Sequence, residues 1–282
     1  MRIETAAENL KDLNHPVLVP TMGSLHDGHL NLVRQAALDG RPVVVSVFVN
    51  PTQFAATDDL DSYPRSLDLD ARGATEAGAS AIYAPSADEI YPRGMDEASK
   101  EAADFPVPQA GTTPGLEDKH RPQFFGGVCL VVARLFDLIA PSKAIFGEKD
   151  WQQLLVIRQM AAQTPRFHQL AIESSPIIRD PDGLAMSSRN TYLDPEDRPH
   201  ALGLRRALRA VEDETDVQRA EELMQSILSE HELRVDYATV RTADTLTSPA
   251  LGDPCRALIA AHLQRGDRKV RLIDNGPTKA GT

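Results

Sequence analysis

The chain alternates between short apolar runs and segments in which apolar residues recur every three or four positions. The continuous apolar runs predict strands, and one of them, VVVSVFVN, is typical of a parallel strand buried on both faces. The helical spacing between the runs predicts an α/β fold around an open, mostly parallel sheet. Expected strands lie at 17–20, 43–50, 80–85, 144–146 and 169–174, and expected helices at 27–39, 66–77, 128–139 and 151–163.

The pattern changes near residue 175. The segment IIRDPDGLAMSSRN predicts two short extended pieces around an Asp-Gly turn. Two charged helices are expected at about 196–212 and 216–231, and the strand-like runs VDYATV, CRALIAAHL and VRLIDN follow them. We therefore expect one domain at 1–175 and a smaller α+β domain at 176–282.

Two other segments carry little periodicity. Residues 86–124 hold many Pro, Gly and Asp residues, which predicts loops. Residues 277–282 are expected to be frayed. No internal repeat is visible along the sequence.

Composition and charge narrow the classes of function. The chain has 282 residues, of which 41% are hydrophobic and 25% charged, as in ordinary globular proteins. Its formal net charge of −11 argues against general nucleic-acid binding, because binding to a phosphate backbone needs a basic surface. This charge still leaves room for a local basic pocket that takes an anionic small molecule.

Hydropathy and cysteine use predict the compartment. No apolar run is long enough to span a bilayer, and the opening residues MRIETAAENLKDL lack the apolar centre of a signal peptide, so we expect no membrane association. Cys129 and Cys255 lie far apart, and Cys129 sits within the run VCLVVARLF as a small buried hydrophobe would. These features favour a reducing compartment, the cytoplasm.

The stretch PTMGSLHDGHLNLV (20–33) carries the first candidate chemistry. It joins the end of an expected strand to a helix that begins near Asp27, a plausible N-cap. Ligands bind outside the carboxyl ends of strands in open α/β sheets, and a helix N-terminus attracts phosphate. Gly23 lets the backbone approach a ligand, and His26 and His29 can donate hydrogen bonds to phosphate oxygens where charge builds up on a leaving group.

Two alternatives stay open for this motif. Both histidines can be surface or capping residues, which is the favoured interpretation of a lone H-x-x-H. A zinc site is a weaker alternative, because no Cys, third His or nearby carboxylate completes a ligand set.

The stretch GEKD (147–150) again lies between an apolar run and a helix start. Gly147 and the loop backbone could lie against a nucleotide, Lys149 supplies a cation, and Asp150 could cap the helix at 151–163. Simple capping beside a solvated Lys is an equally good interpretation of this stretch alone.

The stretch DGLAMSSRN (182–190) combines hydroxyls, a guanidinium and backbone donors on a loop. Such a loop could close over a triphosphate and neutralise its charge. A polar turn between domains is the alternative.

Two glutamines lie close to these segments. Gln53 follows the strongest strand in NPTQF, and Gln153 lies one turn into the helix at 151–163. Each could orient a substrate with its amide, although an exposed glutamine is usually just solvated.

Together these segments resemble one family in chain order. PTMGSLHDGHLNLV, VSVFVNPTQF, LDSYPR, FGEKDWQQL and DGLAMSSRNTYL are similar to the successive motifs of the pantothenate synthetase (pantoate–β-alanine ligase) family. The resemblance covers most of residues 17–193. The combination is specific, whereas H-x-G-H alone occurs throughout a nucleotidyltransferase superfamily. The family implies a Rossmann-like N-terminal domain, a smaller α+β C-terminal domain and a homodimer.

The resemblance also implies a two-step reaction. The carboxylate of pantoate attacks the α-phosphorus of ATP, which gives pantoyl adenylate and pyrophosphate. The amine of β-alanine then attacks the adenylate, which gives pantothenate and AMP. Mg²⁺ is expected to arrive with the ATP phosphates, and no protein metal ligand is assigned.

The family pattern carries roles onto individual residues. His29 takes the catalytic position, with His26 and Lys149 beside it in charge stabilisation. Gln53 and Gln153 are implied to hold pantoate. The implied ATP contacts are Met22, Gly23, His26, His29, Gly147, Lys149, Asp150, Ile178, Met186, Ser187, Ser188 and Arg189.

The sequence departs from the family pattern in three places, one of which is the segment 94–118, which is unusually acidic and irregular for the family. A segment resembling RPxHFxGV usually carries a histidine where RPQFFGGV has Phe124. After the Tyr-Pro-Arg, only Asp68 and Asp70 remain of the acidic residues found in some relatives. Two alternative functions stay open: a nucleotidyltransferase that keeps the adenylylated product, and a catalytically silent nucleotide-binding homologue, which only Phe124 supports.

Overall fold

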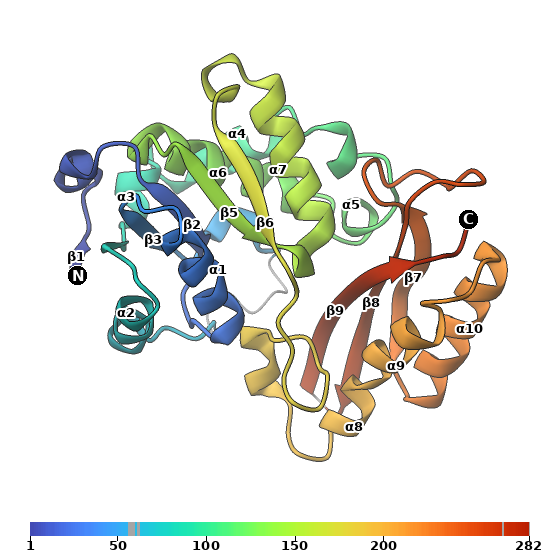
Figure 1. Ribbon diagram of the computed structural model, residues 1–282. Coiled ribbons are helices and arrows are strands. Elements are labelled where there is room, and N and C mark those ends of the chain that lie inside the picture. Colours follow the sequence, from blue (N-terminus) through green and yellow to red (C-terminus); the bar gives the residue numbers. More distant parts are fainter. Residues whose placement is uncertain (56–59, 61–62, 267, 282) are drawn as a thin grey trace. The chain divides into compact units, whose positions relative to one another are not determined.

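The computed structural model describes residues 1–55, 60, 63–266 and 268–281 (Figure 1). The chain divides into two compact units. The first comprises Met1–Glu148 and Gln152–Pro176, and the second comprises Lys149–Trp151 and Ile177–Thr282.

The first unit is built on a parallel sheet. Within the described residues this sheet has six strands in the order β1-β4-β3-β2-β5-β6. Every strand pair in it is parallel, as the apolar runs predicted. The strands are β1 (Arg2–Glu4), β2 (Val17–Thr21), β3 (Val43–Val47), β4 (Ala81–Tyr83), β5 (Lys143–Gly147) and β6 (Ala171–Ser175).

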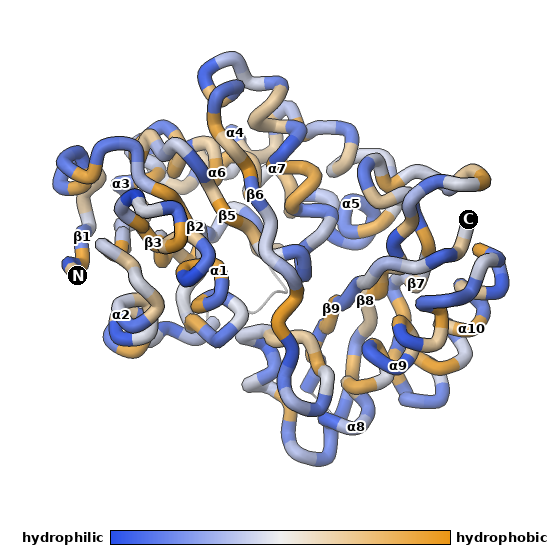
Figure 2. The backbone as a smooth tube through the Cα atoms, in the orientation of Figure 1, coloured by the Kyte–Doolittle hydropathy of each residue, from blue (hydrophilic) through white to orange (hydrophobic). Residues whose placement is uncertain are grey.

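The central strands are buried on both faces. Val17 and Val19 of β2 pack with α1 (Asp27–Ala37) and α2 (Leu67–Glu76) in one hydrophobic core. Leu18, which points to the other face because side chains alternate along a strand, is also fully buried. Figure 2 shows these strands as hydrophobic segments inside the unit. No helix in the described part of the chain is long and apolar enough to cross a membrane.

The expectation of loops at 86–124 is wrong. This stretch forms α3 (Ala87–Ile90), α4 (Met95–Ala103) and α5 (Glu117–His120), and α6 (Phe124–Ile139) already begins at its end. The buried residues of α4 are Ala98 and Ala102. Alanine adds little to a hydrophobic pattern, so the helical spacing of α4 was not visible as an apolar stripe.

The first unit also contains α7 (Trp151–Gln163), apart from its first residue. The second unit is an antiparallel sheet covered by helices. The strands β7 (Arg234–Thr242), β8 (Cys255–Arg265) and β9 (Arg268–Thr278) pair in that order. The helices α9 (Gly203–Ala210) and α10 (Val217–Glu230) pack on one face.

Two local expectations in the second unit are wrong. The helix expected at 196–212 is split into α8 (Arg198–Ala201) and α9, and Gly203 packs so closely on His231 that a Cβ at Gly203 would lie 2.7 Å from the His231 Cβ. Residues 277–281 are also held rather than frayed, and Thr282 lies outside the described residues. The backbone N–H of Gly281 donates to Thr215 O at 2.8 Å, and Ala280 is fully buried.

Candidate active site

Three of the predicted site segments follow three neighbouring strands of the first unit. β3 and β5 lie on either side of β2, and all three run in the same direction. The loop 22–26 follows β2, Gln53 lies in the turn after β3, and Gly147 ends β5. Since the chain leaves β2 toward β3 on one side and later returns to β5 on the other, β2 marks a switch point, where α/β sheets bind ligands.

The loop after β2 is tightly fitted. Gly23 has a φ of +85°, and a Cβ there would lie 2.9 Å from Val47 Cγ1 and 3.1 Å from Asp70 Oδ2. The Thr21 hydroxyl accepts from the Gly23 N–H at 3.1 Å and donates to Ser46 O at 2.7 Å. Only glycine combines this backbone conformation with so little space. The loop is therefore held at a fixed distance from the sheet.

Asp70 holds the same loop and was not among the predicted site residues. Its carboxylate accepts the backbone N–H of Ser24 at 2.9 Å and of Leu25 at 2.7 Å, as well as the Ser66 hydroxyl at 3.2 Å. The side chain is buried together with Ala71 on the inner face of α2. A carboxylate at helical spacing within a buried stripe is the sequence signal that could have revealed it.

We expect Asp70→Asn to lower the free energy of unfolding by about 1–3 kcal/mol, because the amide NH₂ must face one of the two backbone N–H donors. The KM for ATP should rise as the loop loosens. Asp68→Asn is the matched control, because Asp68 lies in the same first turn of α2 but is exposed. Urea denaturation and steady-state kinetics measure both effects, and equal behaviour of the two variants would contradict the assigned role of Asp70.

His26 and His29 together cap α1. His26 is the N-cap, so the expectation that Asp27 caps the helix is wrong. The His26 Nδ1 accepts from the Gly28 N–H at 3.1 Å, and the His29 Nδ1 accepts from the His26 N–H at 3.4 Å. The two rings lie 4.0 Å apart between centroids. Because each Nδ1 accepts, each neutral ring carries its proton on Nε2, where it can donate.

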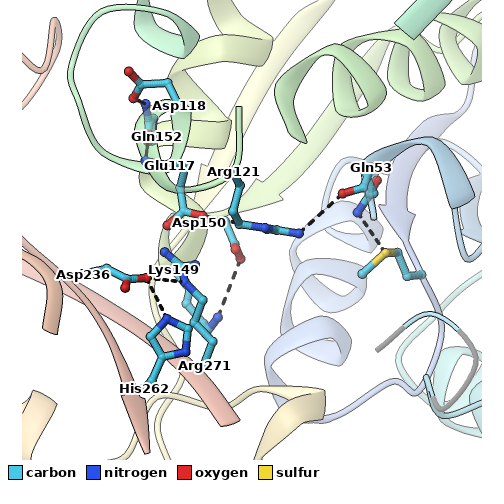
Figure 3. A network of polar contacts seen from close by, with 11 residues as sticks. Gln53, Glu117, Asp118, Arg121, Lys149, Asp150, Gln152, Asp236, His262 and Arg271 are labelled. Atoms are coloured by element: carbon cyan, nitrogen blue, oxygen red, sulfur yellow. Dashed lines mark hydrogen bonds and ion pairs between the residues drawn. The ribbon is translucent and has the colours of Figure 1, made fainter. Parts of the chain in front are cut away.

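The amide of Gln53 is oriented by its neighbours. Gln53 Oε1 accepts from Asn50 Nδ2 at 3.0 Å. Gln53 Nε2 lies 3.0 Å from Met22 Sδ, and a dashed line in Figure 3 joins Gln53 to this sulfur atom. Asn50 is buried and also donates to Gly127 O and accepts from the Tyr91 hydroxyl at 2.7 Å. Burial raises the pKa of Tyr91 to about 12, so this hydroxyl stays a donor. The structure thus brings the predicted residues Met22 and Gln53 into contact.

The start of α6 packs directly on the Gln53 turn. A Cβ at Gly127 would lie 2.5 Å from the Thr52 carbonyl carbon and 2.7 Å from the Gln53 nitrogen. A Cβ at the preceding Gly126 would overlap the carbonyl oxygen of Ala102 in α4. The Gly-Gly pair of RPQFFGGV therefore sets how closely α6 approaches two different neighbours.

In the first turn of α7, Gln152 is buried and Gln153 is half-buried. The Gln152 amide accepts from the Glu117 N–H at 2.9 Å and donates to Ala110 O and to Asp118 Oδ1 (Figure 3). Gln152 therefore ties the segment around α5 to α7. This positioning role of Gln152 was not predicted, whereas the predicted Gln153 keeps part of its surface exposed.

The GEKD stretch divides between the two units. Gly147 belongs to the first unit, and within the described residues no atom apart from those of Gly147 and its two chain neighbours lies within 4 Å of the position that its Cβ would take. Lys149 and Asp150 belong to the second unit, and Lys149 Nζ lies 4.0 Å from Asp150 Oδ2. Glu148–Asp150 form a 3-10 turn that runs straight into α7, and capping of α7 by Asp150 stays a prediction.

The predicted loop of the second unit is a short hairpin followed by a helical turn. Met186 N donates to Ile178 O at 3.0 Å, and the predicted Asp-Gly turn places Gly183 at a φ of +99°. The Ser187 hydroxyl accepts from the Arg189 N–H at 3.3 Å and caps a 3-10 helix, Ser188–Tyr192. The hairpin therefore brings Ile178 next to Met186, at the start of the 186–189 segment.

A polar cluster lies on the sheet of the second unit (Figure 3). Asp236 accepts from His262 Nε2 and from Arg271 Nε, each at 2.9 Å. Burial lowers the pKa of His262 below its ordinary value despite this carboxylate. Among the residues that the structure describes, no group of three or more His, Cys, Asp or Glu side chains is placed to hold a metal ion.

Comparison with known proteins agrees with this geometry. The model of the family described as pantoate-β-alanine ligase matches residues 2–277. The chain belongs to this family. Its sequence is 44% identical over 265 residues to the pantothenate synthetase of Thioalkalivibrio sulfidiphilus. This alignment covers 92% of the chain and 89% of that protein.

Solved structures of the family have the same fold. The crystal structure of pantothenate synthetase from Thermus thermophilus has a TM-score of 0.84 and 37% identity, with coverage of 98% of this chain and 99% of that chain. The pantoate-β-alanine ligase of Francisella tularensis, complexed with "Beta-gamma ATP" and β-alanine, has a TM-score of 0.77 and 28% identity, with coverage of 100% and 99%. The predicted family and fold class are confirmed.

The predicted activity is confirmed with the family. The chain is a pantoate-β-alanine ligase of pantothenate biosynthesis, with ATP as a substrate. Family membership over nearly the whole chain leaves the nucleotidyltransferase and the silent homologue without support.

Phe124 packs in a way that explains how this ligase accommodates it. It is the first residue of α6, its ring lies 5.1 Å from that of Phe125, and the Arg121 guanidinium carbon lies 3.9 Å from its centroid. The ring thus helps to hold Arg121, whose Nη2 donates to Gln53 O at 3.4 Å.

We expect Phe124→His to change the KM for pantoate or ATP by less than about tenfold, because a single cation–π contact between two partly buried side chains is worth about 1 kcal/mol. Steady-state kinetics of both proteins measure this. Pantothenate formation by the variant alone, with none by the parent protein, would overturn the expectation.

Proposed function

We propose that adenylation takes place at the carboxyl edge of β2, β3 and β5, with His26 and His29 donating to the ATP phosphates. In this step a pantoate carboxylate oxygen forms a bond to the α-phosphorus, and the bond from that phosphorus to the pyrophosphate oxygen breaks. The supporting observation is the capping pair at the switch point, which fixes both imidazole rings as Nε2–H donors at the N-terminus of α1. Donors preorganised in this way stabilise charge that develops on the leaving group.

We propose that Gln53 and Gln153 hold pantoate. The acceptor of the Gln53 Nε2 is the thioether of Met22, and sulfur is a weak acceptor. A carboxylate or hydroxyl of pantoate is a stronger acceptor and can replace it. The oxygen of the same amide is fixed by Asn50, so the NH₂ keeps its direction when pantoate binds.

The second step needs no protein nucleophile. The β-alanine amine attacks the acyl carbon of the adenylate, the bond from that carbon to the AMP oxygen breaks, and the amine loses a proton. Positioning of the amine next to the adenylate is the main requirement. Gln53, which lies in the turn after β3, is proposed to contact β-alanine as well as pantoate.

We propose that the second unit supplies the remaining contacts to the nucleotide. Lys149 and Arg189 contribute positive charge, and the neighbouring backbone and hydroxyl groups contribute hydrogen bonds. Mg²⁺ is proposed to bind through the ATP phosphates, since both oxygens of the nearby Asp70 accept backbone N–H groups of the loop. The proposed contacts of this unit are Lys149, Asp150, Ile178, Met186, Ser187, Ser188 and Arg189, and those of the first unit are Met22, Gly23, His26, His29 and Gly147.

We further propose domains at 1–175 and 176–282, a homodimer and a cytoplasmic location. The family resemblance supports the homodimer, which light scattering on the purified protein would test. ATP as a substrate and two buried, unpaired cysteines, Cys129 and Cys255, support a location in the cytoplasm.

Isotope exchange between pyrophosphate and ATP tests the proposed chemistry. Exchange that depends on pantoate and stops when β-alanine drains the adenylate supports the two-step reaction at this site. Exchange that proceeds without pantoate would count against the proposed adenylation step. Exchange that is unchanged in a Gln53→Ala variant at subsaturating pantoate would count against the proposed role of Gln53.

A further inference from the structure

Two adjacent residues of β9 each hold a different segment of the second unit. Asp274 and Asn275 are both buried, with exposed fractions of 3% and 2%. Successive side chains of a strand point to opposite faces, so the two reach different partners. Those partners are the two segments of this unit that carry proposed ATP contacts.

Asn275 anchors the Lys149 segment. Its Nδ2 donates to Lys149 O at 2.8 Å, and its Oδ1 accepts from Arg256 Nη1. The Arg256 guanidinium carbon lies 3.6 Å from the centroid of the Trp151 ring, and Trp151 Nε1 donates to Ala243 O at 2.8 Å. The three residues Lys149–Trp151 are therefore fastened to the sheet by a backbone bond, a stacked guanidinium and an indole hydrogen bond.

Asp274 anchors the hairpin that precedes the 186–189 segment. It accepts from both terminal nitrogens of Arg179, at 2.7 and 2.9 Å. Arg179 also donates to Gly183 O at 3.1 Å and forms a bridge with Ala185 across the hairpin. A bidentate pair of this kind fixes the orientation of the guanidinium, and hence of the hairpin strand that carries it.

We propose that Asp274 and Asn275 are positioning residues for adenylation, Asn275 through Lys149 and Asp274 through the hairpin that carries Arg189. The proposal rests on the proposed function of Lys149 and Arg189 as ATP contacts. Because the two residues are adjacent on β9, a single strand holds both segments. Groups that neutralise a triphosphate act well only in a fixed arrangement, and a shift of about 1 Å can cost about 10²-fold in rate.

A double-mutant cycle tests the link between Asn275 and Lys149. We expect Asn275→Ala to slow single-turnover adenylation by between about ten- and a hundredfold. In a Lys149→Ala background the same change should slow it by less than about twofold, because coupled residues are not additive. The parallel cycle pairs Asp274→Asn with Arg189→Ala and carries the same expectation.

Thr278→Ala is the matched control for loss of stability. Thr278 lies on the same strand, and its buried hydroxyl donates to Val211 O, away from both segments. The melting temperature should fall in this variant, whereas the adenylation rate should not. If Asn275→Ala does not fold, Asn275→Asp replaces it, because it keeps an acceptor for Arg256 and removes the donor to Lys149.

The outcomes separate the two levels of inference. If Lys149→Ala slows adenylation and Asn275→Ala does not, the positioning role of Asn275 is refuted. The proposed role of Lys149 in ATP binding is then unaffected. An Asn275 effect of equal size in both backgrounds also refutes the positioning role of Asn275. A Lys149→Ala variant of normal rate refutes the proposed role of Lys149 itself, and the Asn275 proposal falls with it.

Discussion

Replacing His29 with Asn is expected to slow pantoyl-adenylate formation by roughly 10²–10³-fold while the free energy of unfolding changes little. The side-chain oxygen of Asn takes nearly the place of the imidazole Nδ1, so it can still accept the His26 N–H that closes the cap of α1. The Nε2–H donor, however, is lost. The variant therefore separates the two functions that the structure gives to one ring.

Single-turnover formation of the adenylate measures the first effect, and urea denaturation measures the second. His29→Ala is the comparison, since it removes the cap acceptor and the donor together and should lose both stability and rate. His29→Gln places an amide near the former Nε2 and should recover part of the rate. A His29→Asn protein with the parent rate of adenylation would remove His29 from the catalytic machinery.

The fold of the first unit was largely readable from the sequence, because its strands are buried on both faces. Runs such as VVVSVFVN have no other stable place in an α/β protein, and Val43, Val44 and Val45 are indeed fully or almost fully buried. The region of α3 to α5 was not readable, because the buried face of α4 is made of alanines. The loops were therefore predicted wrongly because the hydrophobic pattern of this region is weak, although the region itself is helical.

Candidate site residues could be predicted from the sequence only where they follow each other closely along the chain. The histidine pair, Gln53 and the hairpin before residue 186 all belong to short motifs whose spacing reflects local structure. Asp70 was missed because it acts 45 and 46 residues away in sequence, on the Leu25 and Ser24 amides. The local pattern of α2 could have marked Asp70 as a buried carboxylate. Its partners, however, depend on how α2 packs against the sheet, which no local pattern specifies.

The N-terminus of α1 shows that two neighbouring residues can compete for the N-cap position. Asp27 is the better N-cap by composition alone, yet His26 takes this place because His29 completes a reciprocal pair with it. The interpretation of the two histidines as capping residues and the proposal that they bind phosphate are therefore compatible. The ring nitrogens that cap the helix are not the ones that are proposed to donate.

Gly127→Ala is expected to raise the KM for pantoate by between about ten- and a hundredfold, because the new Cβ must push the Thr52–Gln53 backbone away from α6. Backbone atoms on both sides leave no flexible side chain to give way, so overpacking should also cost about 1–3 kcal/mol of stability. The hydrogen bond from Asn50 to Gly127 O would shift with the turn, and with it the amide of Gln53.

Gly126→Ala distinguishes a specific effect on this turn from a general loss of packing. Its Cβ would overlap the carbonyl oxygen of Ala102 in α4, so it should destabilise the protein to a similar extent. It does not press on the Gln53 turn, and the KM for pantoate should stay within about twofold of the parent value, as expected for a change outside the binding contacts. Equal KM values for the two variants, measured well below their melting temperatures, would show that the close approach of α6 serves stability alone and does not place Gln53.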